Sequence, residues 1–295
     1  MTAAVLAIAN SSAGTASDTS LDIALDVLRE HHDDVRLETT SSPDDLTDAL
    51  ARHDDVGIVV ALGGDGSLHA VVAALHDAGR LKDVAVGLVP LGTGNDFARS
   101  VDLPNDPAAA AEIVATGEPR PLDLIVEEQG TVIVNAAHLG AGTEAALAAK
   151  PLKERFGPIG YALGALVSGF RVEGKHLTIT IDGEPVRAHG RVLQVAVGNG
   201  RFVGAGTALL PEADPADGLM DVAIVLSHSR RKRLGYLLSL GLRRHHRRDD
   251  VLYVRGAEVV VEGAELASTN DGEIADPMPR HHWRIEPGVL RMYVP

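Results

Sequence analysis

The stretch Val56-Gly-Ile-Val-Val-Ala-Leu-Gly-Gly-Asp-Gly-Ser-Leu-His-Ala-Val-Val-Ala-Ala-Leu75 joins a β-branched apolar run to an alanine-rich run. The pattern predicts a buried strand, a glycine turn and a helix. Glycines without a Cβ allow several amide N–H groups to point into one concavity, which is a natural seat for phosphate. Asp65 lies in that turn, and because a bare carboxylate repels phosphate, it indicates a bridging magnesium ion. A tight turn capped by Asp65 or Ser67 is the simpler alternative.

A second stretch has the same design, Val84-Ala-Val-Gly-Leu-Val-Pro-Leu-Gly-Thr-Gly-Asn-Asp-Phe-Ala-Arg-Ser100. It predicts a strand, a turn over residues 92–94 and a helix opened by Asn95 and Asp96. Ligands of parallel sheets bind beyond the carboxyl ends of the strands, so we expect the two turns to form a two-sided phosphate clamp. Neither turn has the Gly-Lys-Ser/Thr of a P-loop or the G-x-G-x-x-G spacing of dinucleotide folds, which disfavours hydride chemistry.

Alternating apolar and alanine-rich runs continue on both sides of these turns through about residue 120. That order predicts βαβ units, and hence a doubly wound parallel sheet in an α/β nucleotide-binding domain over residues 1–121. Short strands with period-two alternation follow, separated by turns such as Asp182-Gly183. They predict a β-sandwich domain over residues 122–286, interrupted by helices at 158–170 and 230–244. The last strand, about 287–295, is free to return to the first domain.

The composition is that of a globular protein with an acidic surface, with 45% hydrophobic residues and a formal net charge of −14. This charge disfavours nucleic-acid binding. The absence of cysteine excludes thiolate chemistry, fits a reducing cytoplasm and leaves oxygen or imidazole ligands for a metal. No apolar run reaches the roughly 18 residues of a membrane span, and the apolar N-terminus lacks a basic leader. We therefore expect a cytoplasmic chain.

The pair of motifs at residues 63–67, Gly-Gly-Asp-Gly-Ser, and 90–99, Pro-Leu-Gly-Thr-Gly-Asn-Asp-Phe-Ala-Arg, resembles the catalytic-domain signature of diacylglycerol kinases and related bacterial lipid kinases. The second motif is the more specific, because NAD kinases and phosphofructokinases share the form of the first. Sphingosine kinases carry a different second motif. The likeness extends over nearly the whole chain, to about Asn270-Asp-Gly-Glu273. It implies ATP-dependent transfer of the γ-phosphoryl group to a diacylglycerol-like lipid, giving phosphatidic acid.

The resemblance also implies which residues hold ATP and Mg²⁺. Asp65, Asp96 and Asp123 would form a carboxylate network that organises Mg²⁺ around the triphosphate. The family's Asn-Pro-x-Ser/Ala-Gly loop reads Asn10-Ser-Ser-Ala-Gly14 here, so a serine replaces the proline that would stiffen it. The residues expected to bind the nucleotide are Asn10, Gly14, Gly63, Gly64, Asp65, Gly66, Ser67, Gly92, Thr93, Gly94, Asn95 and Asp96.

A second, structural magnesium site is implied at Asp214, Asp217 and the carbonyl oxygen of Leu219. Two carboxylates three residues apart, followed by a turn-forming glycine, can wrap oxygens around one hard cation. From the residues alone, a surface Asx-turn before a strand is an equally good interpretation.

The proton acceptor is expected among the remaining acidic residues. Phosphoryl transfer needs an in-line hydroxyl, charge neutralisation by Mg²⁺ and a carboxylate that takes the proton. The resemblance places residues 271–273 at the reacting hydroxyl, so Glu273 or Asp271 is the expected base, with Asp65 as the rival. A plain hairpin turn is the alternative for this Asp-Gly pair.

The run Ser229-Arg-Arg-Lys-Arg-Leu-Gly-Tyr-Leu-Leu-Ser-Leu-Gly-Leu-Arg-Arg-His-His-Arg-Arg248 brackets an apolar helix with eight cationic residues. Cations beside apolar surface suit anionic lipid headgroups, so Arg230 to Arg248 is the expected peripheral contact with the inner face of the membrane. A packed helix with solvated basic ends is the alternative. The lipid substrate is expected in a pocket of the second domain near residues 139–149 and 161–170. A homodimer is left open.

Two other functions stay open at this stage. A kinase of another alcohol, such as a sphingoid base, phosphatidylglycerol or NAD, would share the first motif. A catalytically silent nucleotide-binding regulator would keep both turns but has no need of a proton acceptor. The silent regulator is disfavoured by the acidic residues that the chain retains, namely Asp65, Asp96, Asp123, Asp271 and Glu273.

Overall fold

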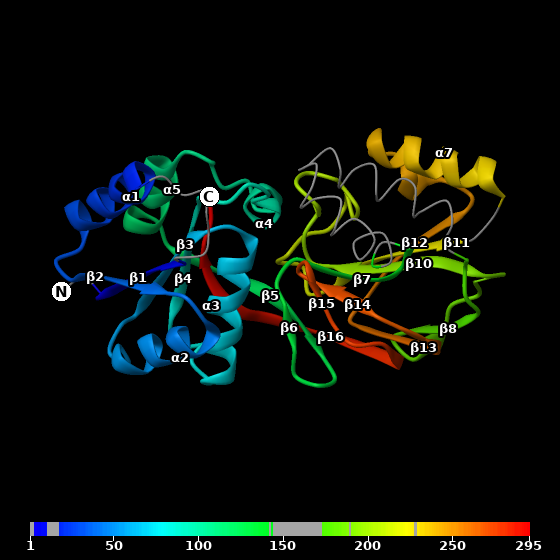
Figure 1. Cartoon of the computed structure of the whole chain (residues 1–295), viewed down its shortest axis with the longest axis horizontal. Coiled ribbons are helices and arrows are strands. Elements are labelled where there is room, and N and C mark those ends of the chain that lie inside the picture. Colours follow the sequence, from blue (N-terminus) through cyan, green and yellow to red (C-terminus); the bar gives the residue numbers. More distant parts are fainter. Residues whose placement is uncertain (1–2, 11–17, 142, 144–172, 189, 227–228) are drawn as a thin grey trace.

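The first half of the chain alternates strands and helices, as the computed structural model shows (Figure 1). The structure describes residues 3–10, 18–141, 143, 173–188, 190–226 and 229–295. The elements in chain order are β1 (Val5–Asn10), α1 (Asp18–His31), β2 (Val35–Thr40), α2 (Pro43–Arg52), β3 (Ile58–Gly63), α3 (Asp65–Asp77), β4 (Ala85–Pro90), α4 (Asp96–Ser100) and α5 (Pro107–Thr116).

Strands β2, β1, β3 and β4 lie side by side in this order, and all of them run parallel. Helices α1 and α5 bury Leu25 and Val114 against one face of the sheet. Helices α2 and α3 bury Leu46 and Leu68 against the other face. The prediction of a doubly wound parallel sheet is therefore confirmed, and its strands β1, β3 and β4 are apolar on both faces.

The second half consists mainly of strands. They are β5 (Pro119–Glu127), β6 (Val132–Ile133), β7 (Ala136–Gly140), β8 (Leu177–Ile181), β9 (Glu184–Pro185), β10 (Val192–Gly198), β11 (Met220–Leu226), β12 (Val251–Gly256), β13 (Glu258–Leu266), β14 (Ser268–Asn270), β15 (Glu273–Ile274) and β16 (Met278–Tyr293). Helix α7 (Arg230–Gly241) and the short 3₁₀ helix η1 (His245–Arg247) lie between β11 and β12.

Two sheets face each other in this half, which confirms the predicted β-sandwich. One has the order β12-β11-β10-β7-β14-β15, and its pairings are antiparallel. The other is formed by β5, β8, β13 and β16 and their short partners. Their inner faces share one apolar core, in which Trp283 of β16 is fully buried beside residues of β7, β10 and β11.

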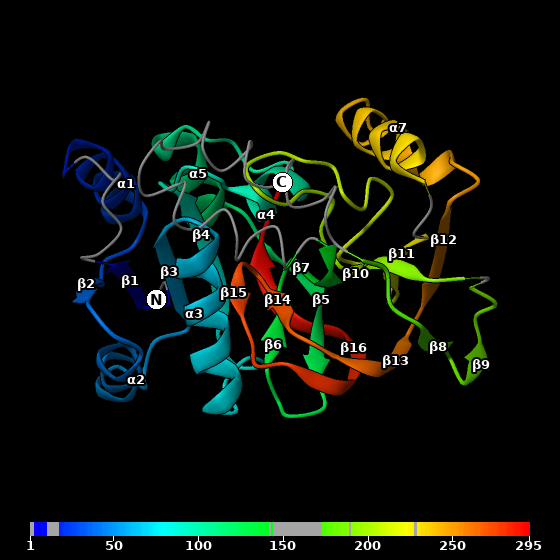
Figure 2. The same cartoon turned by 45° about the vertical axis from the view of Figure 1, so that its right-hand side comes forward.

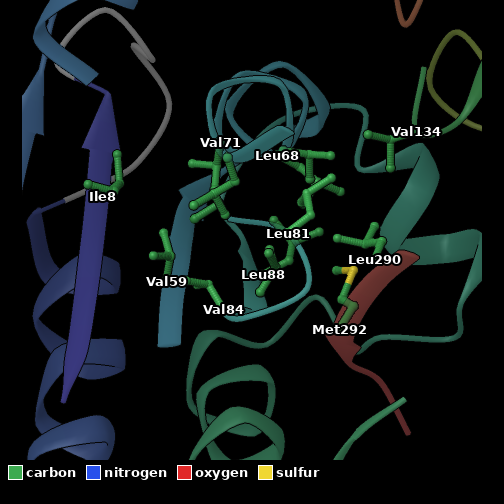
Figure 3. Close-up of a cluster of buried hydrophobic side chains, with 14 of the residues drawn as sticks. Ile8, Val59, Leu68, Val71, Leu81, Val84, Leu88, Val134, Leu290 and Met292 are labelled. Carbon is green, nitrogen blue, oxygen red and sulfur yellow. The ribbon is translucent and has the colours of Figure 1, made fainter. Parts of the chain in front are cut away.

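Strand β16 joins the two halves into one sheet. It pairs antiparallel with β13 and β5, and Met292 near its end pairs parallel with Val86 of β4. The register between β16 and β5 shifts between Glu286 and Leu290. Figure 3 shows Leu290 and Met292 packed among the side chains of the first half. The parallel sheet therefore takes its last strand from the far end of the sequence.

The division expected after residue 121 falls inside β5. Leu122 and Leu124 of this strand belong to the core of the parallel sheet, whereas Ile125 faces the core of the sandwich. One strand thus serves both cores, and the two units share structure at the point where the sequence texture changes.

Helix α7 covers the outer face of the six-stranded sheet, as Figures 1 and 2 both show. Its Tyr236 is buried against Leu193, Val225 and Val251 of that sheet. The expected helix at 158–170 and most of the expected lipid-pocket residues lie outside the described residues. Within the described part of the chain, no helix is long and apolar enough to cross a membrane.

Candidate functional site

The two glycine turns touch each other through their backbones. A Cβ built on Gly92 would lie 2.6 Å from the Cα of Gly64, so only glycine fits this approach. The Leu91 amide donates to the carbonyl oxygen of Gly63 at 2.9 Å and extends the parallel ladder into the turns. Asn95 adopts a left-handed φ of 50° at the N-cap of α4, and its Nδ2 donates to the Gly92 carbonyl at 2.9 Å. The turns form one compact cradle at the carboxyl ends of β3 and β4.

The Asp65 side chain also holds the two turns together. Its two carboxylate oxygens accept hydrogen bonds from the amides of Asp96 and Phe97, at 3.0 and 2.9 Å. These amides are the free donors of the first turn of α4, so the carboxylate of the first motif caps the helix of the second. A Cβ on Gly94 would lie 3.0 Å from Asp65 Oδ2, which explains the glycine there.

A hollow of about 370 Å³ opens beside the second turn. It is lined by that turn together with Ser20, Arg99 and Asn105. This volume lies in the range of small-molecule sites, which is roughly 300–1,000 Å³. The cradle therefore borders a space in which a phosphate-bearing ligand can lie.

The other residues expected to bind nucleotide are placed around the cradle. A Cβ on Gly66 would meet no atom within 4 Å, so this glycine faces open space. Thr93 is exposed, Asn10 is exposed at the end of β1, and the Ser67 side chain lies back against the first turn. Gly14 lies outside the described residues.

Asp96 connects the cradle to the second half of the chain. Its buried carboxylate accepts from the amides of Ala205 and Gly206, at 2.8 and 2.7 Å, and pairs with Arg99 at 2.8 Å. Both amides come from residues with positive φ, which turn successive N–H groups toward one anion. Burial raises the pKa of Asp96, and the nearby charge of Asp65 adds to this rise against the amide bonds. The Asp96 carboxylate therefore links α4 of the first half to the loop at residues 205–206 of the second half through hydrogen bonds.

Asp123 of β5 also links distant segments of the chain through hydrogen bonds. Its two oxygens accept from the amides of Gly218 and Gly288, at 2.7 and 2.9 Å. The carboxylate is buried and ties β5 to two turns of the second half. The hydrogen bonds of the Asp123 carboxylate run to neither Asp65 nor Asp96, and its place in the expected magnesium network stays a prediction.

The described residues contain no group of three acidic or imidazole side chains placed to hold a metal. Asp65 uses one lone pair of each oxygen for an amide and keeps the others available. Mg²⁺ commonly binds to one or two carboxylates and completes its shell with water and substrate phosphates. The donor set at the cradle fits a magnesium ion that arrives with a nucleotide, with Asp65 as its protein ligand.

The segment expected to form a structural magnesium site carries the hydrogen bonds of Asx-turns. Asp214 accepts from the amide of Ala216 at 3.0 Å, and Asp217 accepts from the amide of Leu219 at 3.1 Å. The second oxygen of Asp217 pairs with the guanidinium of Arg255. A magnesium ion at this turn stays a prediction, and it would have to compete with that arginine.

Asp271 is buried at a left-handed φ of 48°, between β14 and β15. Its carboxylate accepts from three successive amides, Val134 at 2.7 Å, Asn135 at 2.9 Å and Ala136 at 3.0 Å. Oδ2 also lies 2.9 Å from Nδ1 of His69 on α3. These four contacts use the acceptor capacity of the carboxylate. Asp271 therefore holds the turn in position, and its oxygens are not available to take a proton from a substrate.

Glu273, two residues further on, is exposed. No hydrogen bond or ion pair among the described residues engages its carboxylate. Its negative charge helps to raise the pKa of the nearby His69. Of the two acidic residues in this turn, Glu273 is the one that is free to act on a substrate.

Two features of the site escaped sequence reasoning. His69 follows Asp65 by one helical turn of α3, and this spacing was the available signal. The second feature is a ring of arginines around Phe202: the guanidinium carbons of Arg99, Arg201 and Arg243 lie 5.7, 5.7 and 5.4 Å from its centroid. They come from distant segments, so only the fold reveals the cluster. It places positive charge beside Asp96 and the phosphate cradle.

The doubly wound sheet and the paired glycine turns fit a phosphotransferase that acts on an alcohol group, and comparisons with known proteins show this class. The family model described as the diacylglycerol kinase catalytic domain matches residues 4–126, and the one described as the YegS C-terminal NAD kinase beta sandwich-like domain matches residues 134–294. The chain belongs to the YegS-like lipid kinase family. The resemblance inferred from the two motifs is thereby confirmed.

Several relatives and solved structures are similar over most of their length. The probable lipid kinase YegS-like of Xanthomonas euvesicatoria is 34% identical over 252 residues, covering 82% of this chain and 80% of the relative. The protein of the same description from Cronobacter sakazakii is 30% identical, covering 91% and 89%. The crystal structure of a putative diacylglycerol kinase from Bacillus anthracis superposes with a TM-score of 0.83 at 24% identity, over 99% of this chain and 97% of that one. The last likeness supports the fold.

Proposed function

We propose that this kinase transfers the γ-phosphoryl group of ATP to the hydroxyl of a diacylglycerol-like lipid, giving phosphatidic acid. The observation that carries the proposal is the cradle in which Asp65 of the first motif caps the helix of the second. That contact fixes the two glycine turns against each other, beside the hollow that the second turn lines. Phosphoryl transfer depends chiefly on such fixed positioning of the reacting phosphates.

In this proposal the turns at Gly63–Ser67 and Gly92–Asn95 hold the nucleotide phosphates, and the hollow beside the second turn receives the nucleotide. Arg99 lines the hollow and adds a fixed positive charge. Mg²⁺, held by Asp65 and the phosphates, would neutralise charge on the transferring group. ATP and Mg²⁺ are the cofactors that fit this donor set.

Glu273 is the proposed proton acceptor for the lipid hydroxyl. Its carboxylate is exposed near His69 and has no partner among the described side chains. Asp271 and His69 position the turn that carries it, through the 2.9 Å contact between them. A carboxylate near the hydroxyl takes the proton as the bond to phosphorus forms, and no covalent intermediate is required.

The substrate of such an enzyme is embedded in a bilayer, so the reaction is proposed to occur at the cytoplasmic face of a membrane. Relatives of this chain are described as probable lipid kinases, which supports a lipid acceptor. Diacylglycerol is favoured over sphingoid bases by the form of the second motif, Pro90-Leu-Gly-Thr-Gly-Asn-Asp-Phe-Ala-Arg99.

The direct test is an assay with γ-labelled ATP and Mg²⁺ against diacylglycerol, phosphatidylglycerol, sphingosine, ceramide and NAD. Labelled phosphatidic acid is the expected product. Labelled NADP with no labelled lipid would overturn the lipid assignment, and a labelled sphingoid phosphate would move it to another acceptor. No product from any acceptor, with ATP still bound, would favour the silent regulator.

A further inference from the structure

Helix α7 exposes a line of leucines to solvent. Leu234 and Leu238 of α7 and Leu242 at its C-cap are 47%, 63% and 70% exposed, and they follow one another at intervals of four positions. This spacing puts them on one face, about one turn apart. The opposite side of the helix already packs on the six-stranded sheet through Tyr236. The helix is therefore apolar on two sides, and one of the two has no partner among the described residues.

Cationic side chains surround this line. Arg231, Arg243, Arg244 and Arg247 are exposed around the same helix and the turn that follows it. Lys232 and Arg248 are paired with Asp249 and Asp250, at 3.3 and 2.6 Å. The segment from 229 to 250 holds eight cationic residues and two acidic ones, in a chain of net charge −14. The leucine line thus lies at the centre of the most basic surface segment.

We propose that the outer face of α7 is the surface by which the protein docks on anionic lipid, with Leu234, Leu238 and Leu242 entering the interface and the flanking arginines binding headgroups. Apolar side chains inside a cationic rim match the layered chemistry of an anionic membrane surface. This inference rests on the proposed lipid substrate, because a bilayer-embedded acceptor makes such docking necessary.

A second copy of the chain fits this face less well. A two-fold interface places the same patch against itself. Arginines 231, 244 and 247 of one copy would then lie among those of the other, and like charges in a desolvated interface cost binding energy. Anionic headgroups complement the same charges, so a lipid surface is the occupant that the electrostatics favour.

The face lies close to the proposed site. Arg243 lies just beyond the end of α7, and its guanidinium carbon is 5.4 Å from the centroid of the Phe202 ring. The guanidinium carbon of Arg99 lies 5.7 Å from the same centroid. Arg99 in turn pairs with Asp96 beside the phosphate cradle. A chain docked through α7 therefore has its phosphate cradle within a few side chains of the lipid headgroups.

The first experiment measures sedimentation with vesicles of equimolar phosphatidylcholine and phosphatidylglycerol, and with vesicles of phosphatidylcholine alone. Neither ATP nor diacylglycerol is present, so the result does not depend on catalysis. The natural protein should bind the mixed vesicles, bind phosphatidylcholine far less, and lose binding as salt rises. Replacing Leu234, Leu238 and Leu242 together with serine should lower binding about tenfold or more.

Replacing Arg231, Arg244 and Arg247 with serine should lower binding to the mixed vesicles about 100-fold, at roughly fivefold for each cation. The matched control is the pair Ile23→Ser and Leu37→Ser, which removes side chains that are 41% and 39% exposed elsewhere on the surface. The control should bind as the natural protein does. Equal binding by the leucine variant, or no vesicle binding by the natural protein, would overturn the proposal.

A fluorescence reporter tests insertion without weakening the face. The single native tryptophan, Trp283, is fully buried and gives a constant background. Leu238→Trp should shift its emission to shorter wavelength on mixed vesicles, whereas Ile23→Trp should not. No shift at position 238 would reject insertion. Sedimentation equilibrium of the leucine variant completes the test, because a dimer that becomes a monomer would assign the face to a second copy.

Discussion

Nδ1 of His69 on α3 lies 2.9 Å from Oδ2 of Asp271 in the turn between β14 and β15, so this pair joins the parallel sheet's helix layer to the sandwich. Burial alone would lower the pKa of His69. The hydrogen bond to Asp271 and its charge, together with the charge of Glu273, outweigh burial and raise the pKa above its ordinary value. The imidazolium is thus favoured in the folded chain.

The pair should make stability depend on pH. A histidine with a raised folded pKa contributes stability that is complete below its unfolded pKa of about 6.5 and disappears as pH rises through the folded pKa. The unfolding free-energy difference between the natural protein and His69→Gln should therefore be larger near pH 6 than near pH 9. Urea unfolding at both pH values measures it. A difference that does not change with pH would mean that the pair carries no net charge interaction.

The glycine contact between the turns should be intolerant of a side chain. Gly92→Ala would push a Cβ to within 2.6 Å of Gly64, so the turns must separate and ATP affinity should fall. Gly66→Ala is the structural control, because its Cβ would meet nothing within 4 Å. Thermal unfolding should show a lower midpoint for Gly92→Ala only. Equal unfolding midpoints for Gly92→Ala and Gly66→Ala would show that the close contact between the two turns does not matter for stability.

The roles of Glu273 and Asp65 should separate in kinetics. Glu273→Gln removes a free carboxylate and should lower kcat by roughly 10²-fold or more while ATP binding is kept. Asp65→Asn disturbs the amide contacts that hold the cradle and should weaken ATP binding as well. Steady-state assays with calorimetric ATP binding distinguish the two. If Asp65→Asn alone lost kcat with unchanged ATP affinity, the assignment of the base would be reversed.

Asp123 should matter for stability more than for chemistry. Asp123→Ala leaves the amides of Gly218 and Gly288 without their acceptor, and each unpaired buried amide costs about 1–3 kcal/mol. A loss of about 2 kcal/mol or more in urea unfolding is expected. ATP affinity, measured where the variant is still folded, should be nearly unchanged. A specific loss of Mg²⁺-dependent ATP binding would instead return Asp123 to the magnesium network.

The turn at Asp214 offers a clear test of the second magnesium site. If Mg²⁺ binds there, millimolar MgCl₂ without nucleotide should raise the unfolding midpoint of the natural protein and not that of Asp214→Asn. Arg255 already pairs with the neighbouring Asp217, so we expect a weak effect at most. Calcium serves as a second probe. A strong, Asp214-dependent rise would show that the metal displaces the arginine.

Local patterns were enough to predict the strand-turn-helix units around Asp65 and Asp96, because their glycines and apolar runs lie within short segments. The path of β16 was harder to predict, because its register with β4 depends on contacts between residues about 200 positions apart. Periodicity reports which face of a strand is buried, but not which strand lies beside it. The sequence allowed the last strand, about 287–295, to return to the first domain, but it placed the other boundary at one residue, whereas the structure distributes that boundary over β5.

The candidate site shows the same division. The turns were found from the motifs, but the partners of the carboxylates were not. Asp96 and Asp123 look like metal ligands in the sequence, yet their oxygens accept backbone amides from residues 205–206, 218 and 288. Asp271 is likewise satisfied by the amides of residues 134–136. A motif shows that an acidic side chain is present, but only the fold shows which donors bind to its carboxylate.

Because β16 supplies the strand next to β4, the parallel sheet lacks a neighbour until residues 278–293 have been synthesised. The first half of the chain therefore emerges from the ribosome with the edge of β4 exposed, as a template for wrong partners. Closure of the parallel sheet on this side must wait until β16 has been synthesised. This strand thus sets the order of assembly, because the edge of β4 is covered only after most of the second half exists.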